Sequence, residues 1–583
     1  MDTSLGGLTV RLWRAIGRPR RRQFQLLLAM MVLSSLAEVV SVGAVLPFLS
    51  ALANPERLLE HPALHSAFER LGVLTPADVI LTTTLAFCAA VVLAGVVRIL
   101  VLRLSLGYAF DLGADISNDV YRRSLYQPYA VHIARNSSEV INGIAIKVSE
   151  VIFYVIVPAM TLFSSAFMAV AIMVTLATFI PASALAAFGV LGVLYTLMMK
   201  MLRQRLRANS DRIARESTNT IRYLQEGLGG IRDILLDRTQ DNFVATFQRS
   251  DAALRKAQRE NQFVSQSPRF LMESAGMVLI ALVALGFSRG GAGVAGVVPT
   301  LAGLALGLQR LLPALQQLYQ SWSSIQGSQG SLRETVKLLE QPLAAAHERM
   351  ASPLRFDDRI ELREVGFSYA VGSPAVLNDF NLVIRKGSRI GFVGETGSGK
   401  STLLDIVMGL LHPSEGCMLV DGVPVTPANV EAWRPHIAHV PQDLFLKDGT
   451  LRENIAFGVP AEAIDDDAVR RAAALAQIGP TIEGWVDGYE TLVGERGVQL
   501  SGGQRQRIGI ARALYKKADV FIFDEATSAL DNATEEAVMR SIEGMDERIT
   551  VLIIAHRLST LRNCDEIVEL HRQAKAVAAD PTT

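Results

Sequence analysis

The sequence predicts two structures in one chain: a membrane all-α domain of six helices, fused to a cytoplasmic α/β domain that contains a phosphate-binding loop. Long apolar runs are confined to residues 1–335. From residue 355 the pattern changes to short apolar strands that alternate with charged, glycine-rich loops. One glycine-rich loop, ending in lysine and serine, lies between such a strand and a helix. These observations predict a linker at 336–354 and a second domain at 355–583.

The composition narrows the classes of partner. Of the 583 residues, 57 are basic and 57 are acidic, so the net charge does not indicate a nucleic-acid partner. The mean hydropathy of +0.28 is high because the apolar runs of the first domain raise it. The three cysteines have the spacing of neither a metal site nor a disulfide framework, which is typical of a reducing cytoplasm. They are Cys88, Cys417 and Cys564.

Six segments are apolar and long enough to cross a bilayer, which takes about 20 residues of helix. The charged gaps at 107–149 and 203–268 keep a helical periodicity, so we expect the adjoining helices to project beyond the bilayer. A large soluble protein with buried helices is the alternative, and the number of such runs argues against it. The predicted spans are residues 24–52, 80–106, 150–177, 179–202, 269–288 and 294–322.

Positive charge predicts the orientation of these spans, because loops rich in arginine and lysine stay in the cytoplasm. Six arginines precede the first span, which we interpret as a retained anchor with a cytoplasmic N-terminus. The loop between the first two spans is then external. Its residues 56–72 predict a short amphipathic helix, either on the outer membrane surface or packed as a lid on the spans. The six arginines are Arg11, Arg14, Arg18, Arg20, Arg21 and Arg22.

The stretch "GETGSGKS" has the pattern of a phosphate-binding loop. Its glycines allow the backbone N–H groups to turn toward phosphate oxygens, and the following helix adds positive potential at its N-terminus. We expect Lys400 to reach the β- and γ-phosphates and the hydroxyl of Ser401 to bind Mg²⁺. The predicted nucleotide-binding residues here are Gly394, Glu395, Thr396, Gly397, Ser398, Gly399, Lys400, Ser401 and Thr402.

The stretch "ADVFIFDEATSALD" predicts a buried strand that ends in two acidic residues. Two adjacent carboxylates after a buried strand are costly unless a cation accompanies them. We therefore expect Asp524 to hold the Mg²⁺ shell and Glu525 to polarise the attacking water.

With these residues the chain resembles the ATP-binding cassette (ABC) transporters. "LSGGQ" at 500–504 is the signature of that family, and "VGERG" at 493–497 precedes it as in exporters. The resemblance implies ATP and Mg²⁺ as cofactors and roles for residues in five motifs. It implies an adenine-stacking tyrosine, a Mg²⁺-sensing glutamine, a signature that contacts the partner's ATP, a coupling aspartate and a switch histidine. These are, in that order, Tyr369, Gln442, the group Ser501, Gly502, Gly503 and Gln504, then Asp531, then His556.

The resemblance also implies a dimer, because each ATP needs the phosphate loop of one subunit and the signature of the other. Inactive ATP sites in this family usually lack the catalytic glutamate or the switch histidine. This chain has both, as Glu525 and His556. A homodimer is therefore the simpler interpretation, and a heterodimer with another subunit is the alternative. ATP binding would close the two ATPase domains. Segments near "QPYAVHIARNSSEV" and "EGLGGIRDILLD" would pass that motion to the membrane helices.

Three arginines in the predicted spans suggest the cargo. Arg98, Arg269 and Arg310 all fall near the inner leaflet at about 1.5 Å of rise per helical residue. Charged groups in spans are functional candidates, and guanidinium matches phosphate in a bidentate way. The alternative is that these arginines only snorkel to the lipid headgroups.

The stretches "QEGLGGIRDILLDRTQDNFVATF" and "SQSPRFLMESAGM" resemble the PglK-type flippases of lipid-linked oligosaccharides. The resemblance implies a polyisoprenyl-pyrophosphate-linked glycan that crosses a bacterial-type inner membrane, with the three arginines as ligands of an anionic headgroup. Three alternatives remain open. They are a lipid A or phospholipid flippase, a peptide or drug exporter, and a membrane ATPase with a regulatory role.

Overall fold

The computed structural model describes most of the chain as two compact units. The first comprises Met1–Gln127 and Arg135–Leu343, and the second comprises Pro128–Ala134 and Ala344–Thr583. We describe each unit separately. The described residues are 4–44, 48, 51–52, 55–56, 75–179, 182–289, 294–343, 354–370, 372–494, 497–525, 532–543, 548–554 and 561–571.

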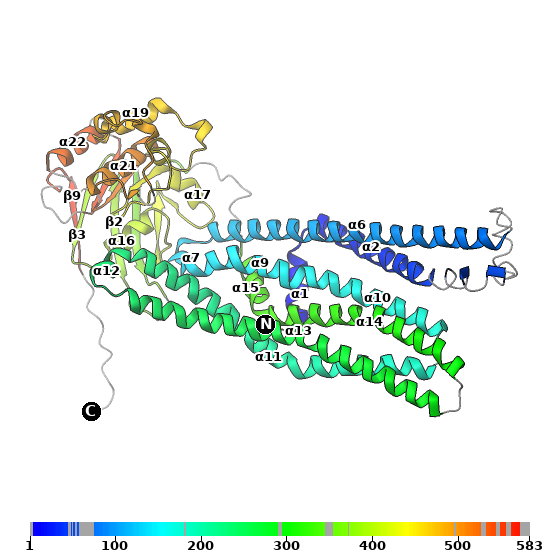
Figure 1. Cartoon of the computed structure of the whole chain (residues 1–583). Coiled ribbons are helices and arrows are strands. Elements are labelled where there is room, and N and C mark those ends of the chain that lie inside the picture. Colours follow the sequence, from blue (N-terminus) through cyan, green and yellow to red (C-terminus); the bar gives the residue numbers. More distant parts are fainter. Residues whose placement is uncertain are drawn as a thin grey trace, which may run out of the picture. The chain divides into compact units, whose positions relative to one another are not determined.

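Every described element of the first unit is a helix (Figure 1). Two of them, η1 and η2, are π-helical turns inside the long helix that leads into α10. The elements are α1 (Leu5–Ala15), α2 (Arg18–Gly43), α6 (Pro76–Leu125), α8 (Ser137–Asn142), η1 (Gly143–Lys147), α9 (Val148–Val151), η2 (Ile152–Ile156), α10 (Val157–Phe179), α11 (Ala182–Gly229), α12 (Ile231–Leu236), α13 (Gln240–Arg289), α14 (Val294–Gly327) and α15 (Gln329–Leu339).

Local sequence explains where the long helices begin. Thr75 caps α6: its hydroxyl accepts from the backbone N–H of Asp78, the Asp78 carboxylate accepts in return, and Pro76 occupies the first turn. The helices α6, α11 and α13 are 50, 48 and 50 residues long, more than the ~20 that a bilayer requires. The predicted spans therefore continue as long helices, and their projection beyond the bilayer stays a prediction.

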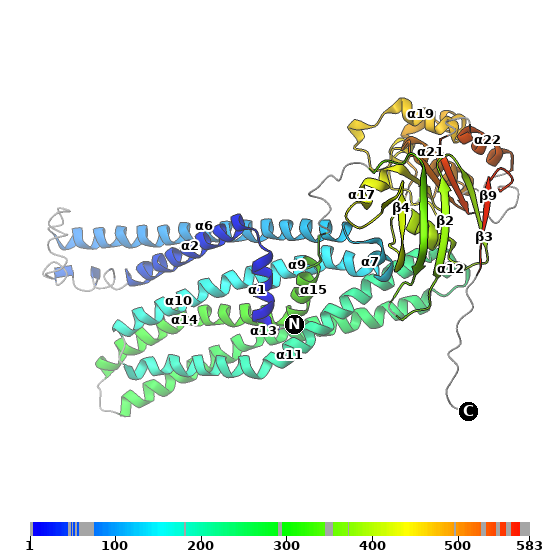
Figure 2. The same ribbon diagram turned by 180° about the vertical axis from the view of Figure 1, so that it is seen from behind.

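The long helices pack in pairs. α2 lies against α6, α10 against α14, and α11 against α13, as Figures 1 and 2 show from opposite sides. Three helices of the described residues are long and apolar enough to cross a membrane: Arg18–Ser41, Pro76–Leu125 and Ser137–Thr175. α11, α13 and α14 cover the other three predicted spans.

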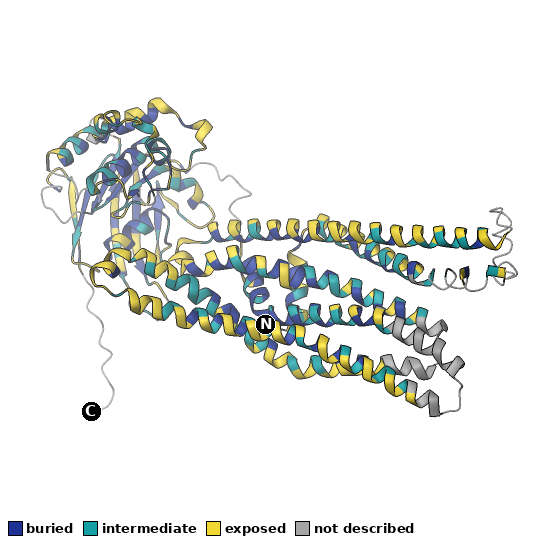
Figure 3. Ribbon diagram, viewed as in Figure 1, coloured by how far each residue is buried: buried dark blue, intermediate teal, exposed yellow. Residues whose placement is uncertain are grey.

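Many residues along these helices are exposed (Figure 3), and large apolar residues are among them. On α6, Leu93, Val96 and Ile99 are 62%, 57% and 69% exposed. A soluble protein would not leave such a face in water, whereas lipid tails or a second copy would cover it.

The second unit contains two sheets. One has the order β2-β1-β4-β5 and is antiparallel, and the other has the order β6-β7-β8-β3-β9 and is parallel. Its strands are β1 (Arg359–Phe367), β2 (Leu377–Arg385), β3 (Arg389–Gly394), β4 (Glu415–Val420), β5 (Val423–Pro424), β6 (Ile437–Val440), β7 (Val520–Asp524), β8 (Thr550–Ile554) and β9 (Glu566–Leu570).

Helices surround these sheets. They are α7 (Tyr129–Ala134), α16 (Lys400–Val407), α17 (Val430–Trp433), η4 (Arg434–His436), α18 (Leu451–Ile455), η5 (Ala461–Ala463), α19 (Asp466–Leu475), α20 (Gly479–Glu483), η6 (Gly488–Glu490), α21 (Gly502–Tyr515) and α22 (Asn532–Glu543). With the helical first unit, this arrangement confirms the predicted fold class.

Strand β7 explains how the second unit builds two cores. Val520 and Ile522 pack into one cluster with β1, β4 and α16. Phe521 and Phe523 point the other way, into a second cluster with α18, α19 and α21. Because both faces of β7 are buried, its sequence is a continuous apolar run, as is typical of a central parallel strand. Such a strand holds the groups at its carboxyl end in fixed positions.

Some expectations fall on residues that lie outside the described ones. They are most of the external helix at 56–72, Asp531, His556 and Glu495–Arg496 of the "VGERG" motif. α15 runs through Leu339, so helix continues into the segment that the sequence suggested as a linker.

Candidate functional site

The predicted nucleotide residues converge at one edge of the parallel sheet. β3 ends at Gly394, β7 ends at Asp524, and β6 ends at Val440, two residues before Gln442. Parallel strands present their carboxyl ends on the same side, which is where α/β domains bind ligands. The fold therefore brings together motifs that are far apart in the sequence.

The phosphate-binding loop needs its glycines for geometric reasons. The φ values of Gly394, Gly397 and Gly399 are +148°, +84° and +99°. Residues that carry a side chain rarely adopt such values. A Cβ atom on Gly394 would lie 2.2 Å from the carbonyl oxygen of Leu570. At this position the loop excludes any larger residue.

The loop also offers groups that fit a phosphate. The Nζ atom of Lys400 donates to the carbonyl oxygens of Gly394 and Glu395 at 2.7 and 2.9 Å, so its charge lies over the loop. The hydroxyl of Ser398 is buried and has no hydrogen-bond partner among the described residues. Buried polar groups normally have partners, so this hydroxyl and the N-terminus of α16 fit an anion in the loop.

The residues predicted to hold Mg²⁺ lie side by side. Burial, followed by the charge of Glu525, raises the pKa of Asp524 above its usual value. A hydrogen bond from Ser401 and the charge of Lys400 lower it, which places both groups next to the Asp524 carboxylate. A hydroxyl and a carboxylate are the hard oxygen ligands that Mg²⁺ prefers, so the donor set fits this ion.

Glu525 is held in an unusual backbone conformation. Its φ is +51°, and its N–H donates to the carbonyl oxygen of Ile554 at 3.1 Å. Its Oε2 atom accepts from Nε2 of Gln442 at 2.8 Å. Strained non-glycine residues cluster at functional sites. The sequence suggested a Mg²⁺-sensing role for Gln442, and the structure adds that this side chain orients the Glu525 carboxylate.

Tyr369 lies at the entrance of the same region. Its hydroxyl is 2.9 Å from Oγ1 of Thr402, and its ring meets Phe367 edge to face at a centroid distance of 5.0 Å. The side chain remains 53% exposed. The ring is thus fixed on two sides while a face stays available for stacking.

The signature residues begin α21. The Ser501 side chain accepts from the N–H of Gln504 at 3.2 Å, and Gln504 Oε1 accepts from the N–H of Ser501 at 2.8 Å. This capping box uses the side chain of Gln504 inside its own helix. Gly502 and Gly503 form the first turn, where they add no side chain between the helix N-terminus and a ligand.

The edge of the parallel sheet formed by the ends of β3, β6 and β7 is called the nucleotide edge below. The sequence analysis did not identify two residues near it. Asp405 follows Ser401 by one turn of α16, and burial, with the charge of Asp524, raises its pKa to about 6. α7 groups with the second unit, and the pKa of its Tyr129 is raised by burial and then by the charges of Asp405 and Tyr369. The acid inside the apolar stretch "LLDIV" was the available signal.

The membrane arginines belong to two different side-chain groups. Arg98 lies 3.9 Å from Glu38 and lines a cavity of about 200 Å³ with Ser105 and Gln317. Arg269 donates to Glu273 at 2.9 Å.

Glu273 also accepts from Gln316 at 3.3 Å. The adjacent glutamines of α14 therefore belong to different groups. Gln316 donates to Glu273, and Gln317 lines the cavity of Arg98. The side chain of Arg310 lies outside the described residues.

Sequence reasoning missed the partners of these arginines. Glu38 in "SLAEVV" and Glu273 in "FLMES" are isolated acids in apolar segments, and "LQQLY" contains the two glutamines. An isolated acid in a span is itself a signal of a partner. Because a carboxylate neighbours both described arginines, neither is an isolated positive charge.

Comparisons with known proteins agree with this geometry. The family described as ABC transporter transmembrane region matches residues 26–301, and the family described as ABC transporter matches 377–528. The ATP-dependent lipid A-core flippase of Cupriavidus metallidurans is 31% identical over 469 residues, 78% of this chain and 76% of that protein. The mycobactin import ATP-binding/permease protein IrtB of Mycolicibacterium thermoresistibile is 36% identical over 349 residues, 56% of this chain and 59% of that protein.

A solved structure shares the fold. The structure of a bacterial Atm1-family ABC exporter with ATP bound aligns with a TM-score of 0.79, at 23% identity and with 95% of each chain covered. The family matches, the Cupriavidus relative and this fold show that the chain belongs to the ABC transporter family, as a multi-pass exporter-type half-transporter whose cytoplasmic domain hydrolyses ATP with Mg²⁺.

Proposed function

We propose that the chain is one half of a homodimeric flippase that moves a polyisoprenyl-pyrophosphate-linked oligosaccharide from the inner to the outer leaflet of a bacterial-type inner membrane. One observation carries this proposal. Arg98 shares a cavity inside the membrane domain with hydroxyl groups and the amide of Gln317. Glu38 neighbours this guanidinium, but the polar groups that share its cavity are neutral hydrogen-bonding groups. A guanidinium among such groups suits a phosphate or pyrophosphate more than a cationic or apolar cargo.

The carboxylates near the arginines are compatible with this role. The 3.9 Å separation between Arg98 and Glu38 exceeds a hydrogen bond, so most of the N–H groups of Arg98 remain available to a ligand. Glu273 fixes the side chain of Arg269 from one side through Nε, which leaves its terminal nitrogens to point elsewhere. Arg310 completes the proposed set of headgroup ligands.

The nucleotide edge supplies the energy in this proposal. The loop glycines and Lys400 bind the phosphates, Tyr369 stacks on adenine, and Glu525 takes the proton of the attacking water while Gln442 holds its carboxylate. Ser401 and Asp524 would hold Mg²⁺, which would supply charge neutralisation at the phosphates. Asp531, His556 and the signature at 501–504 complete the site across the dimer. The domain boundaries at 335 and 355 are part of the same proposal.

A lipid A or phospholipid flippase is the second candidate. The name of the Cupriavidus relative favours it, and an anionic lipid headgroup would use the same arginines. The two candidates differ in the transported lipid and share the same ATPase domain.

Proteoliposomes with internal or external ATP test the proposal. The assay follows a fluorescent polyprenyl-pyrophosphate oligosaccharide and, in a parallel arm, a fluorescent lipid A, with ATPase rates taken on the same samples. We expect the wild type to flip the oligosaccharide lipid, and Arg98→Ala and Arg310→Ala to hydrolyse ATP without flipping it.

Arg103→Ala is the matched control, because Arg103 is also an exposed arginine of α6 but does not line the Arg98 cavity. Movement of lipid A alone would replace the proposed cargo by the second candidate. ATP hydrolysis with neither lipid moved would reject both.

A further inference from the structure

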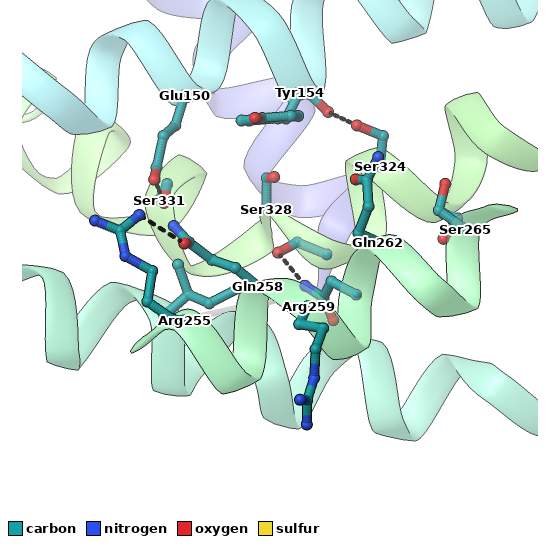
Figure 4. A pocket seen from close by; sticks show the side chains of 14 residues that line it. Glu150, Tyr154, Arg255, Gln258, Arg259, Gln262, Ser265, Ser324, Ser328 and Ser331 are labelled. Carbon is teal, nitrogen blue, oxygen red and sulfur yellow. Dashed lines mark hydrogen bonds between the residues drawn. The ribbon is translucent and has the colours of Figure 1, made fainter. Parts of the chain in front are cut away.

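A second, larger cavity lies in the first unit, at the level where three predicted spans meet the cytoplasm. Its volume is about 560 Å³. Its walls come from η2 and α9, from α11 and α13, and from the bend between α14 and α15 (Figure 4). Gln262 on α13 precedes the fifth predicted span by seven residues, which is about 10 Å of helix. The cavity is therefore at the inner membrane boundary, where a cargo headgroup begins its path.

Most of the residues that line this cavity are polar and neutral. Hydroxyl and amide side chains predominate, and Glu150 is the one carboxylate among its described lining residues. The hydroxyl of Ser323, whose residue is 1% exposed, and the Oδ1 atom of Asn261 have no hydrogen-bond partner among the described residues. Leaving a buried polar atom unpaired costs about 1–3 kcal/mol, which a bound polar ligand would recover.

Several of these side chains are already positioned for a ligand. Glu150 accepts a hydrogen bond from Ser331, which leaves its second oxygen free to accept another. Arg255 donates from Nη1 to Oε1 of Gln258 at 3.3 Å, and its Nε atom lies 3.3 Å from the carboxylate of Asp251 one turn earlier on α13. In Figure 4 the guanidinium of Arg255 reaches toward Ser331, whereas the side chain of Arg259 points away from the cavity.

Tyr154 adds an aromatic surface. Its side chain is 50% exposed, and Figure 4 shows it at the cavity wall that faces α13. Its backbone carbonyl accepts from Ser324 at 3.1 Å, which joins η2 to α14 at this point. A carboxylate, several amides and hydroxyls, and an aromatic face together match a polyhydroxylated ring, which needs many donors and acceptors and offers an apolar C–H face.

We propose that this cavity binds the sugar part of a phosphorylated-sugar headgroup on the cytoplasmic side, before the headgroup reaches the membrane arginines. Glu150, Gln258 and Asn261 hold the sugar hydroxyls, Tyr154 packs on the ring, and Arg255 meets the phosphate. This inference rests on the proposed function for its ligand class. The polyisoprenyl-pyrophosphate-linked glycan and lipid A both carry such a headgroup, whereas an ordinary phospholipid does not.

Cysteine protection tests the site on the full-length chain. Cys88, Cys417 and Cys564 are replaced by serine, and Ser324→Cys then places one thiol in the cavity wall. Lys256→Cys is the matched control, because Lys256 is exposed on the same helix α13 but does not line the cavity. The rate of labelling by a charged maleimide is measured with diacetylchitobiose, with diacetylchitobiose 1-phosphate and with inorganic phosphate alone.

We expect the phosphorylated disaccharide to slow labelling at residue 324 about fivefold or more and to leave labelling at residue 256 unchanged. Arg255→Ala removes one charge-assisted contact with the phosphate. The concentration of phosphorylated disaccharide that gives half-maximal protection should therefore rise about tenfold. The neutral disaccharide should be unaffected by this change. Arg259→Ala, which removes the arginine that points away, should alter neither.

The flipping assay on the same cysteine variants separates this inference from the proposed function. Transport of either lipid without protection by the disaccharides would overturn the sugar site and leave the flippase proposal intact. Protection with neither lipid transported would support the site and reject the proposed cargo. Equal protection at residues 324 and 256, or protection by inorganic phosphate alone, would also overturn the sugar site. Size-exclusion chromatography and ATPase rates confirm that each variant is folded.

Discussion

The nucleotide edge and the membrane cavities of this chain use polar residues in opposite ways. At the nucleotide edge, the functional groups follow directly after β3, β6 and β7, so the ends of parallel strands place them. In the membrane domain, Arg269 and Glu273 pair within one turn of α13, but the other polar contacts join different helices and form only after packing. Arg98 of α6 meets Glu38 of α2, and Gln316 of α14 meets Glu273 of α13.

A sequence motif therefore predicts a site reliably only where consecutive residues set the geometry of that site. A loop such as 394–401 contains its own geometry, because its glycines and its helix start are consecutive. A membrane arginine has no such local context, because its chemistry depends on whether a carboxylate or a cavity lies beside it.

Glu525→Gln should produce the largest change. Removing the general base should lower ATP turnover by about 10²–10⁴-fold while ATP binding persists, because the amide still fills the site. Turnover by the purified protein and filter binding of ATP measure the two properties. Gln442→Ala, which removes the partner at 2.8 Å, should lower turnover less. Turnover at the wild-type rate in the Glu525→Gln variant would mean that another group is the base.

Two glycine substitutions test whether the loop is as rigid as its contacts imply. Gly394→Ala should lower the free energy of unfolding by about 3 kcal/mol or more, because its Cβ would lie 2.2 Å from the Leu570 oxygen. Gly397→Ala should lower it by only about 1–2 kcal/mol, because it keeps the φ strain but meets no atom within 4 Å. Thermal unfolding without nucleotide gives both values, and equal losses would contradict the close contact at Gly394.

His439 on β6 tests the sheet that supports the nucleotide edge. Burial lowers its pKa to about 4, so the folded chain holds the neutral ring while the unfolded chain binds a proton near pH 6.5. Stability is therefore fully present above pH 6.5 and falls by at most about 3 kcal/mol as the pH drops toward 4. His439→Gln should flatten this part of the pH profile of the melting temperature. An unchanged slope would assign the pH dependence to other groups.

A double variant tests whether Arg269 binds the cargo or only neutralises the charge of Glu273. Arg269→Ala should lower transport about tenfold, as expected for the loss of one charged contact, with ATPase activity retained. Arg269→Ala combined with Glu273→Gln removes the unpaired acid as well. Transport that stays low in the double variant supports a headgroup ligand, whereas full recovery would make Arg269 a structural partner.

Tyr369→Phe should have the smallest effect. It removes the hydroxyl contact with Thr402 but keeps the ring, so the KM for ATP should rise about threefold with little change in kcat. Tyr369→Ala removes the ring too and should raise KM further. A larger effect of the phenylalanine variant than of the alanine variant would argue against stacking.

The fold class was predictable from the sequence alone, and the sequence motifs include the residues that the described structure gathers at the ends of β3, β6 and β7. Apolar runs of span length, the loop "GETGSGKS" and the strand "VFIFD" are consecutive patterns, and backbone geometry acts on consecutive residues. The long helices beyond the spans were also predictable, because a continuous periodicity over α6 and α13 leaves no break in the pattern.

Which polar groups contact one another depends on how the helices and strands pack. The bond between Gln442 and Glu525, the carboxylate beside Arg98 and the polar cavity between α13 and the α14–α15 bend join residues far apart in the chain. Sequence spacing indicates a face of a helix but not the neighbour across it. That neighbour is selected by close packing of whole helices, which sums many small contacts that no single motif encodes.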